Sequence, residues 1–207
     1  MYQPWREPDF QRQFAGVKSR TLLSPEACWH LVKGLRQSLA AADGRTAAVY
    51  ELGVYRGGTA RLMRECVEGT GNILRLFDTF AGMERSNPSR GDRHGPGAFS
   101  DTSLGTVREF VGREGFIDYR VGWVPKTFGG IEDDEVIFAH VDLDLHDPIL
   151  ASCEFIYPRL RKGGWMVLDD YGFPSTPGAR MAIDSFFKDK REHPIILQTG
   201  QAIVVKL

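Results

Sequence analysis

Four aspartates follow two neighbouring apolar runs of the chain, and their placement is the strongest chemical signal in the sequence. Asp142 and Asp144 come at the end of one run, and Asp169 and Asp170 come directly after the next. If both runs are strands of one parallel sheet, these carboxylates converge at its carboxyl edge. Acids gathered there raise one another's pKa unless a cation lies among them, and an all-oxygen set favours a hard ion such as Mg²⁺. The pattern therefore predicts a magnesium site, whereas any one of these aspartates alone could equally cap a helix.

A glycine-containing segment, ELGVYRGGT at residues 51–59, leaves an earlier apolar run and enters a helical pattern. Glycine lets a backbone approach a ligand closely because it has no Cβ. The spacing differs from the G-x-G-x-x-G of dinucleotide sites, so a pyrophosphate cradle is disfavoured. Glu51 suits a cationic ligand better than a phosphate, and S-adenosylmethionine presents an ammonium and a sulfonium. The alternative is a plain strand-to-helix turn with glycines for packing.

Asp78 ends the next apolar run, at about the separation from Gly53 that a strand–helix–strand unit requires. A carboxylate at this strand tip can accept hydrogen bonds from both ribose hydroxyls of an adenosine, although it could instead cap a helix or stabilise a turn. With the glycine segment, it predicts an adenosine-containing cofactor. A divalent ion beside a methyl sulfonium would bind an acceptor hydroxyl, lower its pKa and aim its oxygen at the methyl carbon.

Around these residues, short apolar runs alternate with helical patterns. Strands are expected at 47–52, 73–77, 117–121, 136–143, 165–168, 195–197 and 202–205. Helices are expected from Ser24 to Asp43-Gly44 and at 59–67, 103–113, 148–160 (broken by Gly163-Gly164) and 177–190. Fully apolar strands favour a mostly parallel sheet covered on both faces, and the four residues between the last two strands allow only an antiparallel hairpin. Seven strands in this layout form the Rossmann-like α/β fold of class I methyltransferases.

The remaining segments and the composition set the domain organisation. A chain of 207 residues with one such sheet is expected to be a single domain, 1–207. Residues 82–100 are rich in glycine and charge and follow a strand end, so we expect a lid over the site rather than a plain surface insertion. Residues 1–23 show no clear period and are expected to form an arm.

The charge balance limits the partners. Lys and Arg number 26 against 27 Asp and Glu, a net charge of −1, so sequence-independent binding to nucleic acid or anionic membranes is not expected. No apolar run reaches the ~20 residues of a membrane span, and the start lacks the apolar stretch of a secretory signal. The three cysteines have no metal or disulfide spacing, so a cytoplasmic location is expected.

Four segments resemble the macrocin O-methyltransferase family: ELGVYRGGTARLM, LFDTFAGM, HVDLDLHDPILASCEFIYPRLRKGGWMVLDDYG and GARMAIDSFF. These enzymes are bacterial, Mg²⁺-dependent, and methylate deoxysugar hydroxyls of macrolides and related natural products. The resemblance implies a class I methyltransferase fold, S-adenosylmethionine as donor, a small hydroxylated acceptor, and a homo-oligomer. It implies Asp142, Asp169 and Asp170 as metal ligands. The expected cofactor contacts are Glu51, Gly53, Tyr55, Gly57, Asp78, Thr79, Phe80, Trp123, Asp142 and Asp144.

The sequence departs from the family beside the presumed acceptor. The family usually has Gly between the two aspartates and then Leu-Tyr-Glu-Ser-Thr, whereas here Asp144 is followed by Leu145-His146-Asp147. Related catechol-type enzymes place a lysine base where this chain has Leu145, which counts against a phenolic acceptor. An alcohol acceptor has a high pKa, so its deprotonation needs both metal activation and a base close to the hydroxyl. Asp142 and His146 are the expected candidates. His140 is expected to be a packed strand residue, and His94 is either an exposed lid residue or a lid residue that reaches into the site.

The leading hypothesis is an S-adenosylmethionine- and Mg²⁺-dependent O-methyltransferase acting on a small natural product, with a sugar hydroxyl as acceptor. A phenolic, carboxylate or amine acceptor is the first alternative. A second alternative is a methyltransferase fold that serves only as a binding protein. This alternative gives no reason for keeping a carboxylate cluster whose mutual repulsion lowers stability. Metal-dependent hydrolysis leaves the glycine segment and Asp78 unexplained.

Overall fold

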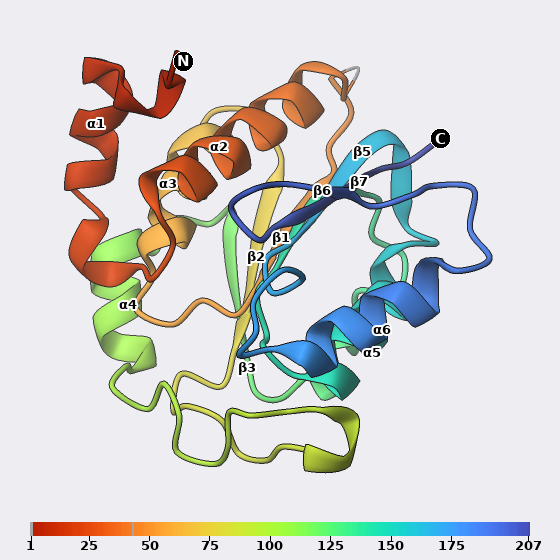
Figure 1. Ribbon diagram of the computed structural model, residues 1–207. Helices are drawn as coiled ribbons and strands as arrows, with labels where there is room; N and C mark the ends of the chain where they lie inside the picture. The colour runs from red at the N-terminus through yellow and green to blue at the C-terminus, as the bar shows by residue number, and fades with distance from the viewer. Residues whose placement is uncertain (1, 43) are drawn as a thin grey trace.

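The computed structural model describes residues 2–42 and 44–207, and its centre is one seven-stranded sheet (Figure 1). The strand order is β3-β2-β1-β4-β5-β7-β6. The strands are β1 (Ala48–Leu52), β2 (Ile73–Asp78), β3 (Ile117–Val121), β4 (Val136–Val141), β5 (Leu160–Leu168), β6 (Ile195–Ile196) and β7 (Ala202–Val205). The first five run parallel, and β7 pairs antiparallel with both β5 and β6. The predicted parallel sheet with a closing hairpin is confirmed.

Two helical layers cover this sheet, as the apolar strands require. The helices are α1 (Pro8–Ala15), α2 (Pro25–Ala40), α3 (Gly58–Val67), α4 (Leu104–Val111), α5 (His146–Ile156) and α6 (Pro177–Phe187). One core cluster joins α2, α3 and α4 to one face of the sheet, and another joins α5 and α6 to the opposite face. Four short 3₁₀ turns lie at Pro4–Arg6, Lys18–Arg20, Pro88–Arg90 and Lys126–Phe128. No helix among the described residues is long and apolar enough to cross a membrane.

Several predicted element ends were wrong by a few residues. Helix α2 starts as predicted, with the Ser24 hydroxyl accepting from Ala27 N at 3.1 Å, but ends at Ala40; Asp43 lies outside the described residues. Helix α5 begins at His146 and ends at Ile156, and α6 stops at Phe187. Strand β4 ends at Val141, so Asp142 and Leu143 belong to the connection that follows.

The glycines predicted to break a helix lie instead inside β5. Strand β5 begins at Leu160, which is buried and pairs with Val136. Gly163 has φ +77°, and a Cβ on Gly164 would lie 2.9 Å from the Ile137 carbonyl oxygen. The two glycines therefore lie at an irregularity of strand pairing, where β4 and β5 pass close to each other. In the sequence alone, the same glycine pair resembles the end of a helix.

The segment expected to be an arm is folded onto the domain. Its described residues form α1 and two 3₁₀ turns, with Phe10 and Phe14 buried one helical turn apart. Together with Val17 they pack on Cys28, Val32 and Leu62 of α2 and α3. Only two large apolar residues mark this face, which is too few to produce a clear period in the sequence.

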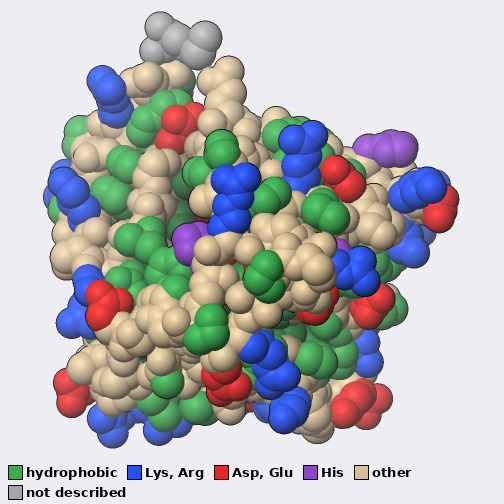
Figure 2. All heavy atoms as spheres, turned by 60° about the horizontal axis from the view of Figure 1, so that its bottom comes forward, with side chains coloured by type: hydrophobic (Ala, Val, Ile, Leu, Met, Phe, Trp, Pro, Cys, Tyr) green, Lys and Arg blue, Asp and Glu red, His purple; other side chains and the backbone are tan. Residues whose placement is uncertain are grey.

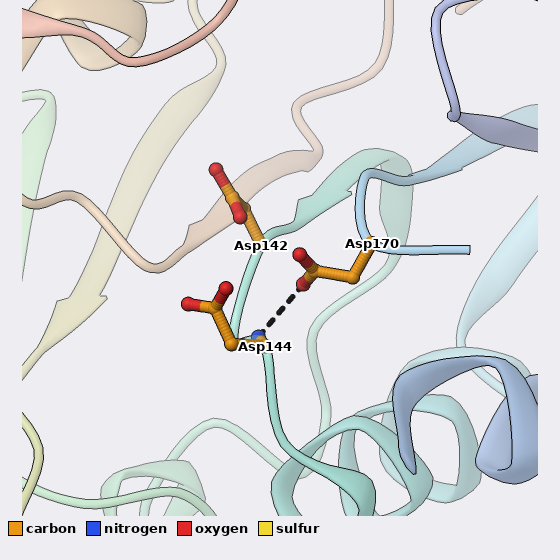
Figure 3. Close-up of side chains that lie close together, drawn as sticks. All are labelled: Asp142, Asp144 and Asp170. Carbon is orange, nitrogen blue, oxygen red and sulfur yellow. Dashed lines mark hydrogen bonds between the residues drawn. The ribbon is translucent and has the colours of Figure 1, made fainter. Parts of the chain in front are cut away.

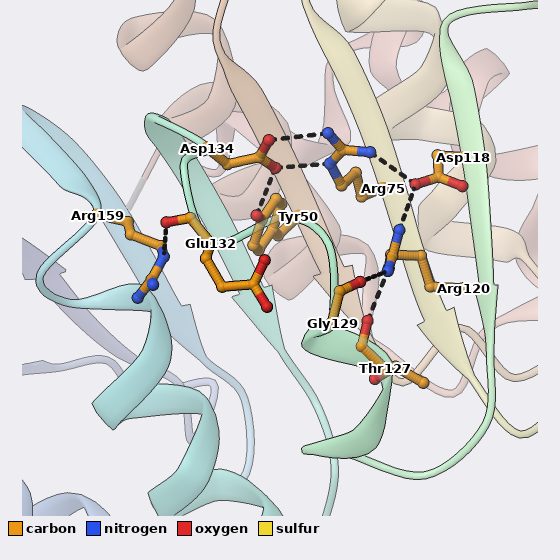
Figure 4. A network of polar contacts seen from close by, with 9 residues as sticks. All are labelled: Tyr50, Arg75, Asp118, Arg120, Thr127, Gly129, Glu132, Asp134 and Arg159. Carbon is orange, nitrogen blue, oxygen red and sulfur yellow. Dashed lines mark hydrogen bonds and ion pairs between the residues drawn. The ribbon is translucent and has the colours of Figure 1, made fainter.

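A polar network supports the other end of the sheet (Figure 4). Arg75 of β2 donates to Asp134 at 2.6 Å and to Asp118 of β3 at 2.7 Å. Tyr50 donates its hydroxyl to Asp134 at 2.6 Å. Arg120 donates to the Thr127 carbonyl oxygen at 2.7 Å. The network ties the β3–β4 connection to the sheet, and that connection brings Trp123 and Val124 to the cavity described next.

Candidate active site

A cavity of about 520 Å³ lies at the carboxyl ends of the parallel strands, a volume suited to a cofactor and part of an acceptor. Figure 2 views this face, where hydrophobic side chains surround a hollow and charged side chains of both signs are spaced around it. Nine of the predicted site residues line the cavity: Gly53, Tyr55, Asp78, Thr79, Trp123, Asp142, Asp144, Asp169 and Asp170. The fold thus gathers residues from the ends of five strands, β1 to β5, at one sheet edge.

Gly53 is required by close backbone packing between the ends of β1 and β4. Its φ is +87°, and a Cβ there would lie only 1.7 Å from the Asp142 carbonyl oxygen. Asp142 N donates to the Leu52 carbonyl oxygen at 2.8 Å, and Gly53 N donates to that of Phe77 at 2.9 Å. Any side chain at position 53 would therefore separate the glycine loop from the first aspartate of the cluster.

Both carboxylate oxygens of Asp78 accept hydrogen bonds from the surrounding backbone. Its Oδ2 accepts hydrogen bonds from Val54 N at 2.7 Å and Tyr55 N at 2.9 Å, and its Oδ1 accepts from Phe80 N at 2.7 Å. The carboxylate therefore fixes both the glycine loop and the turn after β2. Its contact with a ribose stays a prediction, and such a contact would be added to these bonds.

Three aspartates form the carboxylate cluster: Asp142, Asp144 and Asp170 (Figure 3). One ligand oxygen from each lies within 4.8 Å of the others. Asp142 and Asp144 come from the connection after β4, and Asp170 reaches toward them from the end of β5. Asp170 Oδ2 accepts from Asp144 N at 2.7 Å, with Asp144 held at φ +60°. Backbone strain of this kind is common where side chains are held for function.

The cluster is electrostatically unbalanced by itself. Burial, followed by the repulsion of neighbouring aspartates, raises the pKa of Asp142 and Asp170 well above the ordinary range. Burial also raises the pKa of Asp144 to about 6. Among the described residues, no Lys or Arg side chain lies within 4.0 Å of these carboxylates, and the nearest basic group is His94 Nε2 at 3.6 Å from Asp144 Oδ1. An all-oxygen set lacking a countercharge fits a hard divalent cation.

Asp169 lies beside this cluster but faces another group. Its Oδ1 accepts from Gln201 Nε2 at 2.7 Å and lies 3.7 Å from His140 Nε2. The other imidazole nitrogen of His140 lies 3.5 Å from Glu51 Oε1. Burial lowers the pKa of His140, but the flanking carboxylates outweigh it and raise the value to about 10. The structure therefore groups Asp144, rather than Asp169, with Asp142 and Asp170.

Four predicted site residues do not line the cavity. Glu51 is fully buried behind it, and burial raises the pKa of its carboxyl. Gly57 precedes α3, where a Cβ would lie 2.8 Å from Val111, and Phe80 packs on Tyr119. His146 begins α5, buried, with Nδ1 at 2.8 Å from Asp147 Oδ1. His94 of the lid segment lines the cavity, so of the two alternatives open for it the structure favours the one in which it reaches into the site.

Some lining residues were missed by sequence reasoning. Two regions contribute most of them, the segment before α2 and the connections around β5 and β7: Arg20, Thr21, Leu22, Leu23, Phe173, Ser175, Thr176 and Thr199. No motif marks these positions, because they reach the cavity through tertiary contacts. Leu22 and Phe173 are 69% and 43% exposed, and large exposed apolar side chains beside a cavity are a signal that only the structure provides.

The sheet order, the glycine loop and the aspartates at the strand ends define a class I methyltransferase fold. Residues 32–201 match the model of the family described as macrocin-O-methyltransferase (TylF), and the chain belongs to this family. The crystal structure of CalS11, a calicheamicin methyltransferase, superposes with a TM-score of 0.74 at 17% identity and covers 99% of this chain and 94% of that one. This likeness concerns the fold.

Two curated relatives are similar in sequence. The 8-demethyl-8-(2,3-dimethoxy-alpha-L-rhamnosyl)-tetracenomycin-C 4'-O-methyltransferase of Streptomyces olivaceus is 30% identical over 151 residues, with 67% of this chain and 58% of the relative covered. The mycinamicin III 3''-O-methyltransferase of Micromonospora griseorubida is 26% identical over 148 residues, with 64% and 58% covered. The match thus spans somewhat over half the length of each relative.

Proposed function

We propose that this protein transfers a methyl group from S-adenosylmethionine to a sugar hydroxyl of a natural product, with Mg²⁺ bound at the carboxylate cluster. One observation supports this most: the glycine loop and the cluster share one cavity, with Gly53 packed directly on the Asp142 backbone. The names of both curated relatives describe O-methylation of natural products, and the first contains a rhamnosyl group.

The donor would occupy the half of the cavity over β1, β2 and β3. Gly53 and Tyr55 of the glycine loop line the cavity there, Asp78 and Thr79 lie at the tip of β2, and Trp123 supplies an aromatic wall. The acceptor would then approach from the side of β5 and β7, past Phe173 and Thr199. The carboxylate cluster stands between the two halves, where methyl transfer requires the acceptor oxygen.

Asp142, Asp144 and Asp170 would hold the metal, which, when bound, lowers the pKa of an acceptor hydroxyl and orients it. Asp169 would support the cluster from behind, since Gln201 and His140 already occupy one of its oxygens. Asp142 would accept the hydroxyl proton, because its carboxylate lines the cavity at the place proposed for the acceptor oxygen. His146 does not line the cavity, so it is not placed to accept the hydroxyl proton.

A phenolic, carboxylate or amine acceptor is the alternative within the same fold. Leu145, at the position of the catechol-type lysine, is buried and cannot take a proton. The acceptor side also has apolar walls at Leu22 and Phe173, which suit the apolar body of a glycoside carrying the sugar. Both features favour a sugar hydroxyl activated by the metal.

The test combines calorimetry with a methyl-transfer panel. S-adenosylhomocysteine should bind the purified protein, and absence of binding at high micromolar ligand would refute the donor assignment. Glycosylated and phenolic acceptors are then incubated with S-adenosylmethionine, and products are sought as a mass increase of one methyl group. EDTA should abolish turnover and Mg²⁺ should restore it; turnover that resists EDTA would remove the metal from the proposal.

A further inference from the structure

Asp92 is a buried carboxylate in the middle of the lid segment, residues 82–100. Only 7% of it is exposed. Its Oδ1 accepts from His146 N at 2.8 Å, and its Oδ2 accepts from Asn87 N at 2.8 Å. Helix α5 has no cap from its own N-cap residue, Leu145. A residue 54 positions earlier in the chain therefore caps this helix.

The same carboxylate also lies against the first turn of α6. A Cβ on Gly178 would lie 2.5 Å from Asp92 Oδ1 and 2.8 Å from the Arg90 carbonyl oxygen. Asp92 thus sits between the N-terminal turns of α5 and α6, in a space that exists because position 178 has no side chain. Both helix ends carry partial positive charge, which favours a carboxylate over a neutral group.

Two residues that follow Asp92 line the cavity. His94 Nε2 lies 3.6 Å from Asp144 Oδ1, and the His94 ring lies 5.3 Å from that of Phe99, centroid to centroid. The Phe99 ring lies 5.8 Å from that of Tyr55 in the glycine loop. This part of the lid segment therefore spans from the carboxylate cluster to the donor half of the cavity.

Other hydrogen bonds hold the ends of the lid segment. Thr79 donates its hydroxyl to the Gly82 carbonyl oxygen at 2.7 Å, and Met83 N donates to that of Ala98 at 2.9 Å. These bonds join the two ends of the segment to each other and to β2. The further tie to α5 is a 3.4 Å contact between Asn87 Nδ2 and the exposed Asp147.

We propose that Asp92 is a positioning residue: it anchors the lid segment to α5 and α6 and thereby sets His94 and Phe99 over the cavity. The consequence for catalysis rests on the proposed function, whereas the anchor itself does not. Loss of the anchor should open the lid segment without disturbing the sheet, because the hydrogen bonds of Asp92 join the N-terminus of α5 to the segment itself, and its contact with α6 is packing against Gly178.

Limited trypsin digestion tests the anchor directly, since Arg85, Arg90 and Arg93 are exposed sites within the lid segment. In Asp92→Asn, one carboxylate oxygen is replaced by an NH₂ group, which cannot accept a hydrogen bond from His146 N or Asn87 N. The lid segment should then open more often, and trypsin cleavage after Arg90 and Arg93 should accelerate by ~10-fold. Asp133→Asn is the matched control, because Asp133 is exposed on the β3–β4 connection. Its cleavage pattern should equal that of the unchanged protein.

Gly178→Ala tests the same contact from the other side. Alanine is a better helix former than glycine, so a purely local effect would leave the protein as stable or more stable. Its Cβ would displace Asp92, so we expect faster cleavage of the lid segment at an unchanged or higher melting temperature. If Asp92→Asn destabilises the whole chain, this variant decides the question. Cleavage within twofold of the unchanged protein in Gly178→Ala overturns the proposal.

A kinetic split then tests the consequence for the reaction. With the acceptor found in the methyl-transfer panel, both variants should raise the donor KM by at least ~5-fold, because Phe99 lies against Tyr55 in the donor half of the cavity, and should leave the acceptor KM within twofold. Equal changes in both constants overturn the positioning role. Failure of S-adenosylhomocysteine to bind the unchanged protein would count against the proposed function instead, and the digestion result would still stand.

Discussion

The two sides of the cavity both place aspartates at strand ends, but they treat the negative charge in opposite ways. At the tip of β2, Asp78 accepts three backbone N–H bonds, which stabilise its negative charge and order the loop around it. At the ends of β4 and β5, three carboxylates, one buried and two half-buried, lie close together with raised pKa values. A carboxylate whose hydrogen bonds are satisfied by the backbone stabilises the scaffold, whereas a cluster of carboxylates without a countercharge would be stabilised by a bound cation.

The largest expected effect comes from Asp142→Asn. This change removes both a metal ligand and the proposed proton acceptor, so turnover should fall by ~10³-fold or more. Affinity for S-adenosylhomocysteine should stay within a few-fold, because the glycine loop is unchanged. Single-turnover methyl transfer and calorimetry measure the two quantities. A variant that retains a tenth of the activity would show that the carboxylate is not needed.

Replacing Asp144 and Asp169 separately should sharpen the ligand assignment. Asp144→Asn should weaken Mg²⁺ binding by ~100-fold, whereas Asp169→Asn should weaken it by ~10-fold as a supporting residue. Titration of Mg²⁺ into the protein with S-adenosylhomocysteine bound compares the two affinities. The reverse order would place Asp169 in the cluster, as the family resemblance implies, and would move Asp144 to the supporting position.

Stability should change in opposite directions on the two sides. Asp78→Asn leaves at least one backbone N–H without its acceptor and should lower the free energy of unfolding by about 2 kcal/mol. Asp144→Asn in the metal-free protein removes repulsion among buried carboxylates and should raise it by about 1 kcal/mol. Urea titrations of both variants give these values. If both variants were destabilised equally, the contrast between scaffold and ligand site would be wrong.

The smallest expected effect is a pH dependence of the metal-free protein. The pKa of Asp144 is about 6 in the folded state against 3.8 for a free aspartate, so the folded state binds more protons between these values. The free energy of unfolding should therefore fall as pH rises from about 4 to 6, by about 1–2 kcal/mol after allowance for partial exposure. Saturating Mg²⁺ should remove the decline. Urea titrations across this pH range, with and without Mg²⁺, provide the check.

The sequence predicted the sheet and much of the cavity, because periodicity and strand-end residues are local signals. Asp142, Asp170, Gly53 and Asp78 all reach the cavity from the predicted connections. The errors lie where a local signal has two physical causes. Gly163-Gly164 resembles a helix stop but serves close strand packing, and His146 resembles a free base but begins a helix whose N–H is held by Asp92.

The sequence by itself determined that the chain folds as an α/β sheet and that acids and a glycine loop meet at one edge of it. Those facts follow from apolar strands, from their alternation with helices along the chain, and from the absence of a Cβ in glycine. Only the tertiary structure decided which acids form the cluster, that His94 rather than His146 lies beside it, and that Asp92 joins the lid segment to two helices. These outcomes depend on side-chain directions and on contacts between residues far apart in the chain, such as Asp92 and His146, which no local pattern encodes.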